Sequence, residues 1–192
     1  MIFYTADQHY CHNNIIKYTN RPFSSVGEMN NVLIKKYNAR VSSRDVCYHL
    51  GDFAMASFPR WKEICSALNG YKILIKGSHD KNAKKMKEVG FNEVHNQLEV
   101  DLGEHGIWLL NHEPVKTPKK LLCAHIHEKW RRLGKFVINV GVDVWNYEPV
   151  TIEELLQAPE DSWYYKCINC GQTIRRLENN EFHYKGYCKC YI

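Results

Sequence analysis

Short apolar runs, each followed by polar residues, recur through the first 150 residues of the chain. Runs of four to seven apolar-rich residues of this kind are typical of β-strands that pack on a core. Six such segments are predicted to be strands: residues 2–6, 46–50, 73–76, 107–111, 121–125 and 136–142.

Helical patterns lie between several of these strands and after the last one. From Met29 onward, apolar residues recur at i, i+3, i+4 and i+8, the spacing of one helix face. Pro59 favours a helix start, and Thr151 is a suitable N-cap before two glutamates. The predicted helices span residues 28–41, 61–68, 82–89 and 152–156. Strands that alternate with helices, followed by denser strands, predict an α/β core with a second sheet.

Aspartates and histidines stand at or just after five of the predicted strands. They are Asp7 and His9, Asp52, the run Gly77-Ser78-His79-Asp80, His112, and the pair His125 and His127. Carboxylate and imidazole ligands from several strand ends suit a pair of divalent cations. Two such cations, roughly 3.5–4 Å apart, can polarise a phosphoryl group and activate a water. Hydrolysis of a phosphate ester is therefore the first functional hypothesis.

Composition agrees with a water-soluble globular protein. The chain has 192 residues, of which 44% are hydrophobic and 24% charged, enough for one domain and a small appendage. No run of 18 apolar residues predicts a membrane span, and the N-terminus lacks the layout of a signal peptide. We therefore expect a cytoplasmic protein that does not bind membranes.

The net charge of +5 is unevenly distributed. Lysines and arginines concentrate on both sides of His125 and His127, at Lys116, Lys119, Lys120, Lys129, Arg131, Arg132 and Lys135. Basic residues around a site would attract an anionic substrate. A solvated surface loop is the alternative interpretation of the same segment.

The eight cysteines fall into two groups. Cys11, Cys47, Cys65 and Cys123 lie in apolar contexts and are predicted to be buried thiols, because a reducing compartment disfavours disulfides. The other four are Cys167, Cys170, Cys188 and Cys190. Their CxxC and CxC spacing predicts one structural zinc ion in a small zinc ribbon, with a tail of reduced cysteines as the alternative.

A polar, turn-prone stretch at 158–162 marks the predicted boundary between a domain of residues 1–157 and the zinc-ribbon module of residues 163–192. About 30 residues cannot build an apolar core, so a metal staple is physically reasonable there. The module mixes basic and aromatic residues, a composition that can bind nucleic acid. A protein-docking or purely stabilising role fits equally well.

The ordered motifs resemble those of the calcineurin-like metallophosphoesterase superfamily over residues 1–157. The matching elements are Asp7-x-His9, Gly51-Asp52, Gly77-Ser78-His79-Asp80, His112 and Ala124-His125-Ile126-His127. The flanking residues 7–16, 20–23, 49–53 and 139–146 are similar to a compact bacterial and viral subgroup. The resemblance implies a four-layer αββα sandwich, with two mixed β-sheets flanked by helices.

The resemblance also implies roles for individual residues. Asp7, His9 and His127 would hold a first metal ion, Asp52 would bridge two ions, and His112 and His125 would hold the second. His79 would act near the leaving oxygen, with Asp80 orienting its ring. A hydroxide bridging the ions would attack phosphorus in line. Manganese is the first expectation for both ions, with iron or zinc as alternatives.

Two positions depart from the superfamily pattern. Ser78 replaces an asparagine whose amide oxygen binds the second metal, so Ser78 would bind directly, act through water, or leave that ion loosely held. Ala124 replaces a glycine, a change that is tolerated unless the backbone needs a positive φ. His12 and Arg21 are predicted to contact the substrate phosphate.

These features favour a phosphodiesterase that acts on nucleotides or nucleic acid, with phosphomonoesters as a second substrate class. The alternative is a catalytically weakened metal-binding protein that serves as a nucleic-acid adaptor through residues 163–192. The motifs leave the exact ester and the oligomeric state open.

Overall fold

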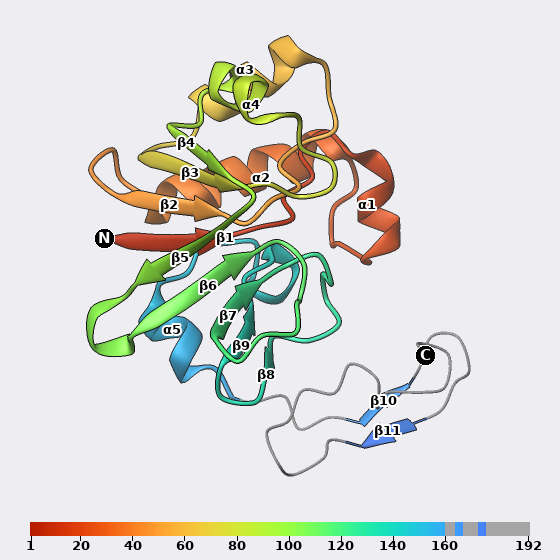
Figure 1. Cartoon of the computed structure of the whole chain (residues 1–192). Helices are drawn as coiled ribbons and strands as arrows, with labels where there is room; N and C mark the ends of the chain where they lie inside the picture. Colours follow the sequence, from red (N-terminus) through yellow and green to blue (C-terminus); the bar gives the residue numbers. More distant parts are fainter. Residues whose placement is uncertain (160–163, 167–172, 176–192) are drawn as a thin grey trace.

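A computed structural model describes residues 1–159, 164–166 and 173–175 of the chain. The first of two large sheets has the strand order β1-β2-β3-β4, and every neighbouring pair is parallel (Figure 1). Its strands are β1 (Ile2–Thr5), β2 (Val46–His49), β3 (Tyr71–Ile75) and β4 (Glu93–His95). The expectation of two mixed sheets is therefore wrong for this one.

The second large sheet is mixed, with the order β5-β6-β7-β9-β8. The pairs β6·β7 and β7·β9 are parallel, whereas β5·β6 and β8·β9 are antiparallel. Its strands are β5 (Gln97–Asp101), β6 (Ile107–Asn111), β7 (Lys120–Cys123), β8 (Arg132–Leu133) and β9 (Val137–Asn139). A separate antiparallel pair joins β10 (Tyr164–Lys166) to β11 (Thr173–Arg175).

The four predicted helices are present, with ends shifted by at most three residues. They are α2 (Val26–Arg40), α3 (Phe58–Ser66), α4 (Ala83–Val89) and α5 (Ile152–Gln157). The structure adds the helix α1 (Asn13–Tyr18) and the short 3₁₀ turns η1 (Gly103–His105) and η2 (Val142–Val144). Side-chain caps explain several starts: Ser25 accepts from the Glu28 backbone, and Asn82 accepts from Lys85. Thr151 forms a capping box with Glu154.

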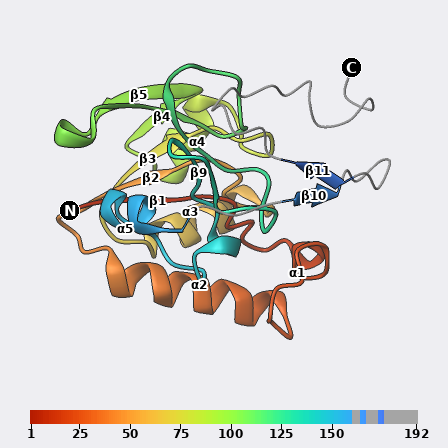
Figure 2. The same cartoon turned by 90° about the horizontal axis from the view of Figure 1, so that it is seen from below.

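Alternating residues of the first sheet separate two cores. Phe3, Cys47 and Leu74 face the buried side chains of α2, α3 and α4, which cover one side of the sheet (Figures 1 and 2). Their neighbours Tyr4 and Tyr48 face the opposite way and pack against buried residues of β6, β7 and β9. This second core lies between the two sheets, so the chain has a mixed α/β fold in which sheet packs on sheet.

The far side of the second sheet is covered differently from the prediction. Leu109, Leu121 and Val137 pack there against Trp130, from the segment between β7 and β8. Helix α5 instead contributes Leu155 to the core between the sheets. Within residues 1–159 an irregular segment thus takes the place of the helical fourth layer.

The cysteine predictions have two outcomes. Cys47, Cys65 and Cys123 are free and buried, as predicted, and Cys11 is free and partly buried. The four predicted zinc ligands, Cys167, Cys170, Cys188 and Cys190, lie outside the described residues, so the zinc site and the 163–192 module stay predictions. Among the described helices, none combines the length and apolar character needed to cross a bilayer.

Candidate metal centre

Loops at the carboxyl ends of four strands, β1, β2, β6 and β7, bring six of the predicted ligands together. Side chains of Asp7, His9 and His127 form one group whose ligand atoms all lie within 4.8 Å of one another. Asp52, His112 and His125 form a second group under the same limit. The parallel pairing of β1 with β2, and of β6 with β7, puts these strand ends on the same side of their sheets. The chain therefore presents two three-residue candidate sites.

Asp52 lies between the two groups. Its Oδ2 is 3.6 Å from Nε2 of His9, in the first group, and 3.4 Å from Nε2 of His112, in its own group. Its other oxygen accepts a 2.9 Å hydrogen bond from the backbone N–H of His79, which fixes the orientation of the carboxylate. In this position Oδ2 could face cations held by either group.

Several polar atoms at this centre are buried and form no hydrogen bond among the described residues. They are Oδ1 of Asp7, both ring nitrogens of His9 and Nε2 of His112. A buried polar atom without a partner costs about 1–3 kcal/mol, so a cluster of them needs an explanation. Divalent cations bound by these oxygen and nitrogen atoms would supply the missing interactions. The donor set suits manganese, iron or zinc.

The backbone of the ligand residues is unusual in a way that also marks a functional site. Asp7, His9, Asp52, His125 and His127 all adopt positive φ angles, between 49° and 72°. Left-handed conformations are uncommon for residues with a Cβ and are found preferentially where function requires them. Five of the six clustered residues share this conformation, so the loops are shaped for side-chain placement rather than for local stability.

Two glycines of the motifs are required by close backbone packing. Gly51 has φ of 92°, and a Cβ there would lie 2.5 Å from the Gly77 nitrogen and 2.6 Å from Nδ1 of His112. A Cβ on Gly77 would meet the Asp52 backbone nitrogen at 2.6 Å. Any side chain at either position would therefore displace a ligand. Ala124 is buried and is not among the residues with positive φ, so its methyl group is accommodated.

His127 is oriented by residues that the sequence did not identify as partners. Its Nδ1 lies 2.9 Å from Oδ2 of Asp143. Arg21 donates to both oxygens of Asp143, at 2.7 and 2.9 Å, and also to the backbone carbonyls of Asp7 and Gln8 at 2.7 and 2.9 Å. A histidine ligand held through its second nitrogen is a common arrangement around metals. Asp143 lies in residues 139–146, one of the flanking segments that resemble the superfamily subgroup, but no motif indicated its role.

The prediction that Arg21 contacts the substrate is wrong, because its side chain is engaged by these hydrogen bonds. The Arg21 side chain is fully buried in its ion pair with Asp143. Its guanidinium donors already serve the protein, so Arg21 stabilises the loops instead of clamping phosphate. Burial raises the pKa of Asp143, but hydrogen bonds from His127 and Arg21 outweigh it and hold that pKa below its ordinary value.

Asp80 also has a different role from the predicted one. Its carboxylate accepts hydrogen bonds from the backbone N–H groups of Gly77, Asp52 and Phe53 at 2.8, 3.0 and 3.1 Å. Asp80 thus ties the Gly51-Asp52 loop to the Gly77–Asp80 loop. It orients Asp52, and no hydrogen bond joins it to the His79 ring in the described part of the chain.

His79 lies at the solvent side of the centre. Its side chain is 48% exposed, and its Nε2 is 3.9 Å from Oδ2 of Asp52. Its ring centroid is 5.5 Å from that of His9. The ring of the partly buried His12 is 5.7 Å from the same His9 ring. Ser78 is exposed in the same loop. His12 and His79 are therefore placed where they can reach a ligand bound at the centre.

In the absence of metal, burial and charge shift the protonation of the ligands. Burial raises the pKa of Asp7 to about 6. Burial alone would lower the pKa of His112. The Asp52 carboxylate, the charge of Asp7 and the hydrogen bond to the Leu50 carbonyl outweigh burial and raise this pKa to about 9. A bound cation must displace such protons, so metal affinity increases as the pH rises.

Basic residues near His125 mostly engage the protein. Arg132 donates to the carbonyls of Leu156 and Ala158 at 2.8 and 2.7 Å, and Lys120 donates to the His105 carbonyl at 2.6 Å. Lys119 pairs with Glu99. These contacts favour a structural role for much of the basic segment over the predicted attraction of substrate.

Comparisons with known proteins provide one clear relative and one clear structural neighbour. The uncharacterized protein MJ1445 of Methanocaldococcus jannaschii is 33% identical over 184 residues, which cover 88% of this chain and 96% of the relative. The protein of unknown function AQ665 from Aquifex aeolicus superposes with a TM-score of 0.67 at 26% identity, over 81% of this chain and 97% of its own. No protein-family model matches the chain.

A third comparison is much weaker. YfcE, a phosphoesterase from E. coli, gives a TM-score of 0.36 at 14% identity, over 73% of this chain and 77% of its own. Similarity at this level bears on neither the fold nor the function of the chain.

Proposed function

The chain belongs to the same family as the uncharacterized protein MJ1445 of Methanocaldococcus jannaschii, and we propose that it is a metal-dependent phosphoesterase with a dinuclear centre. The observation that carries this proposal is Asp52, whose Oδ2 faces His9 and His112 of two separate ligand groups. A site built to hold two cations side by side is suited to phosphoryl transfer to water. Phosphodiesters are the first expected substrates, with phosphomonoesters as the second class.

In the proposed reaction, six residues bind the cations and two histidines contact the substrate. Asp7, His9 and His127 would hold one cation, His112 and His125 would hold the other, and Asp52, close to both groups, would serve both. When bound, the two cations lower the pKa of a water and neutralise charge on the phosphoryl oxygens. His79, exposed beside Asp52, donates a hydrogen bond or a proton to the leaving oxygen. His12, whose ring is also close to His9, contacts a phosphate oxygen.

Replacement of His79 by alanine tests the enzymatic role directly. We expect 4-nitrophenyl phosphodiester or monoester hydrolysis with Mn²⁺ to be abolished by a chelator and restored by added Mn²⁺. The His79→Ala protein should retain its manganese but lose roughly 10²–10⁴ in kcat, the usual contribution of a positioned acid. His95→Ala is the matched control, because His95 pairs with Glu93 on β4. A wild-type protein that hydrolyses neither ester with bound manganese would contradict the proposal.

Replacement of Ser78 by asparagine tests the second cation site. An amide oxygen reaches further than a hydroxyl and is a stronger neutral donor. We therefore expect Ser78→Asn to tighten binding of the second Mn²⁺, seen by calorimetry, and to raise turnover. Ser43→Asn, at an exposed position between α2 and β2, controls for the substitution itself. Unchanged metal affinity and rate would show that position 78 does not contribute a ligand.

A further inference from the structure

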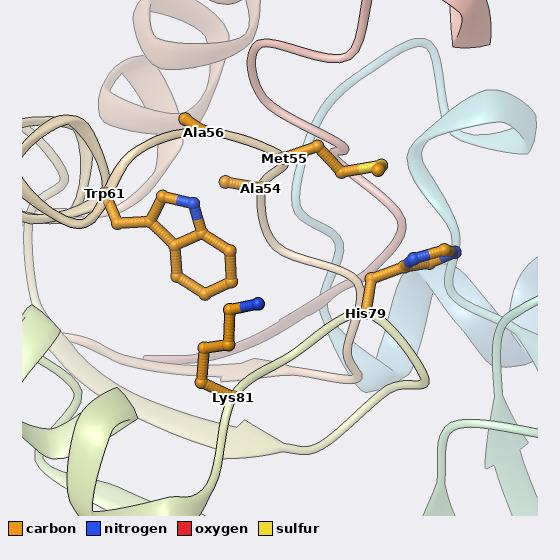
Figure 3. Close-up of a pocket in the computed structure, with 6 residues that line it drawn as sticks. All are labelled: Ala54, Met55, Ala56, Trp61, His79 and Lys81. Atoms are coloured by element: carbon orange, nitrogen blue, oxygen red, sulfur yellow. The ribbon is translucent and has the colours of Figure 1, made fainter.

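A cavity of about 400 Å³ opens beside His79 and is not used by the proposed metal chemistry. Its lining residues are Ala54, Met55, Ala56, Trp61, His79 and Lys81 (Figure 3). They come from the loop after β2, from α3 and from the loop after β3. The volume lies in the range of small-molecule binding sites.

His79 connects this cavity with the metal centre. Its ring lines the cavity, and its Nε2 is also 3.9 Å from Oδ2 of Asp52. An ester whose phosphate lies at the cations, with its leaving oxygen at His79, would therefore extend its leaving group toward Trp61 and Met55. The chemistry of the cavity wall then decides which leaving groups fit.

The wall combines an aromatic and apolar surface with polar groups. Trp61 is buried to all but 3%, and its indole N–H has no acceptor among the described residues. Met55 is 41% exposed and supplies an adaptable thioether. The Lys81 ammonium lies 6.0 Å from the centroid of the Trp61 ring. Such a wall suits a flat heteroaromatic group that stacks on apolar atoms and offers acceptors to a cation.

Further cations lie on α3, which supplies Trp61, and on the adjoining α4. The ammonium groups of Lys62 and Lys85 lie 5.0 and 5.5 Å from the centroid of the Phe58 ring. With Lys81 they add positive charge to this part of the molecule. Positive charge on these elements favours a leaving group that carries additional phosphate over an uncharged apolar one.

We propose that the cavity is a base-binding subsite that receives the nucleobase of a nucleotidyl leaving group. The inference rests on the proposed phosphoesterase function, whose substrate class it specifies. Met55 and the small exposed part of Trp61 provide the contact surface, Lys81 faces the acceptors of the base, and His79 lies at the scissile bond. A free nucleotide and the end of a nucleic-acid strand share this chemistry.

Substrates that differ only in the base test the subsite. Adenosine 5′-monophosphate is compared with ribose 5-phosphate, and a short single-stranded oligonucleotide is compared with one whose terminal nucleoside is abasic. We expect kcat/KM to be on the order of 10-fold higher when the base is present, the lower range for one stacked base. The pair with the larger ratio distinguishes free nucleotides from strand ends.

Charge reversal at the cavity provides the matched variants. Lys81→Glu should reduce the base-dependent ratio by about half or more, because a carboxylate would face the acceptors of the base. Lys84→Glu, exposed on α4 and not among the lining residues, makes the same change in charge and should leave the ratio unaltered. Equal reduction in both variants would mean that only general electrostatic attraction is involved, and would overturn the subsite.

A binding measurement separates this inference from the proposed function. In metal-free protein, the Trp61 indole ¹H–¹⁵N resonance, assigned with Trp61→Phe, should shift on addition of adenosine 5′-monophosphate and not of ribose 5-phosphate. That shift without hydrolysis of any ester would support the subsite and refute the enzyme. Hydrolysis with equal kcat/KM for both members of each pair and an unmoved Trp61 resonance would overturn the subsite alone.

Discussion

Asp52→Asn should bind fewer than two manganese ions per chain and lose at least about 10² in kcat, the effect of removing one strong electrostatic partner from an active site. The reason is the position of Oδ2 between His9 and His112. An amide has one oxygen and no net charge, so it cannot neutralise two cations. Metal content by elemental analysis and rates on an aryl phosphodiester would measure both effects.

The metal-free Asp52→Asn protein is expected to remain folded. The amide oxygen can still accept the His79 backbone N–H, and loss of the charge removes a repulsion that contributes to the raised pKa of Asp7. Asp101→Asn is the control, because Asp101 is exposed and caps only the Gly103 backbone N–H at 3.0 Å. A full complement of two ions in Asp52→Asn, with wild-type activity, would contradict the bridging role.

The clustering of the six candidate ligands could be predicted because each of them lies shortly after an apolar strand. Apolar runs such as residues 46–50 are easily recognised, and a short loop leaves Asp52 little freedom of position. Parallel pairing then brings the strand ends together, as with β1 and β2. The order of strands and polar residues therefore predicts that these side chains meet, whereas the placement of Asp52 between two groups came from the family resemblance.

The roles of Arg21 and Asp80 could not be read from the sequence, because their partners depend on the tertiary fold. Asp143 lies 122 residues from Arg21 along the chain. The backbone donors that hold Asp80 include Asp52 and Phe53, 28 and 27 residues away. Arg21 was predicted to contact the substrate and Asp80 to orient the His79 ring, whereas their hydrogen bonds in the fold assign both side chains to support of the loops.

Strands with little apolar character were also missed. Residues of β4 are only partly buried, and β5 alternates between exposed and partly buried positions. Neither therefore has the apolar run that marks a buried strand. The six-residue helix α1 was missed for a related reason, since Ile15 is its one buried side chain. Pairing with a neighbouring strand, rather than a local sequence pattern, defines β4 and β5.

The ion pair of Arg21 with Asp143 should dominate the stability of the loops around the centre. Both side chains are buried, with exposures of 0% and 2%, and the pair is bidentate. Arg40 also contacts both carboxylate oxygens of Glu154, but through Nη2 alone and with side-chain exposures of 26% and 40%. Both pairs thus join an arginine to two carboxylate oxygens, and they differ most in burial. Removal of one partner is costly only where the other charge stays buried.

Arg21→Met is accordingly expected to lower the free energy of unfolding by about 3–5 kcal/mol at pH 7, and Arg40→Met by less than about 1 kcal/mol. Urea denaturation in the presence of a chelator measures both without a contribution from metal. The pKa of Asp143 lies below the ordinary aspartate value of 3.8 in the folded protein, so the stabilising effect of its charge is fully present above that pH and is lost as the pH falls below it. The difference in unfolding free energy between wild type and Arg21→Met should therefore narrow below about pH 4. Equal effects of the two substitutions, or a difference independent of pH, would show that Arg21 does not stabilise a charged Asp143.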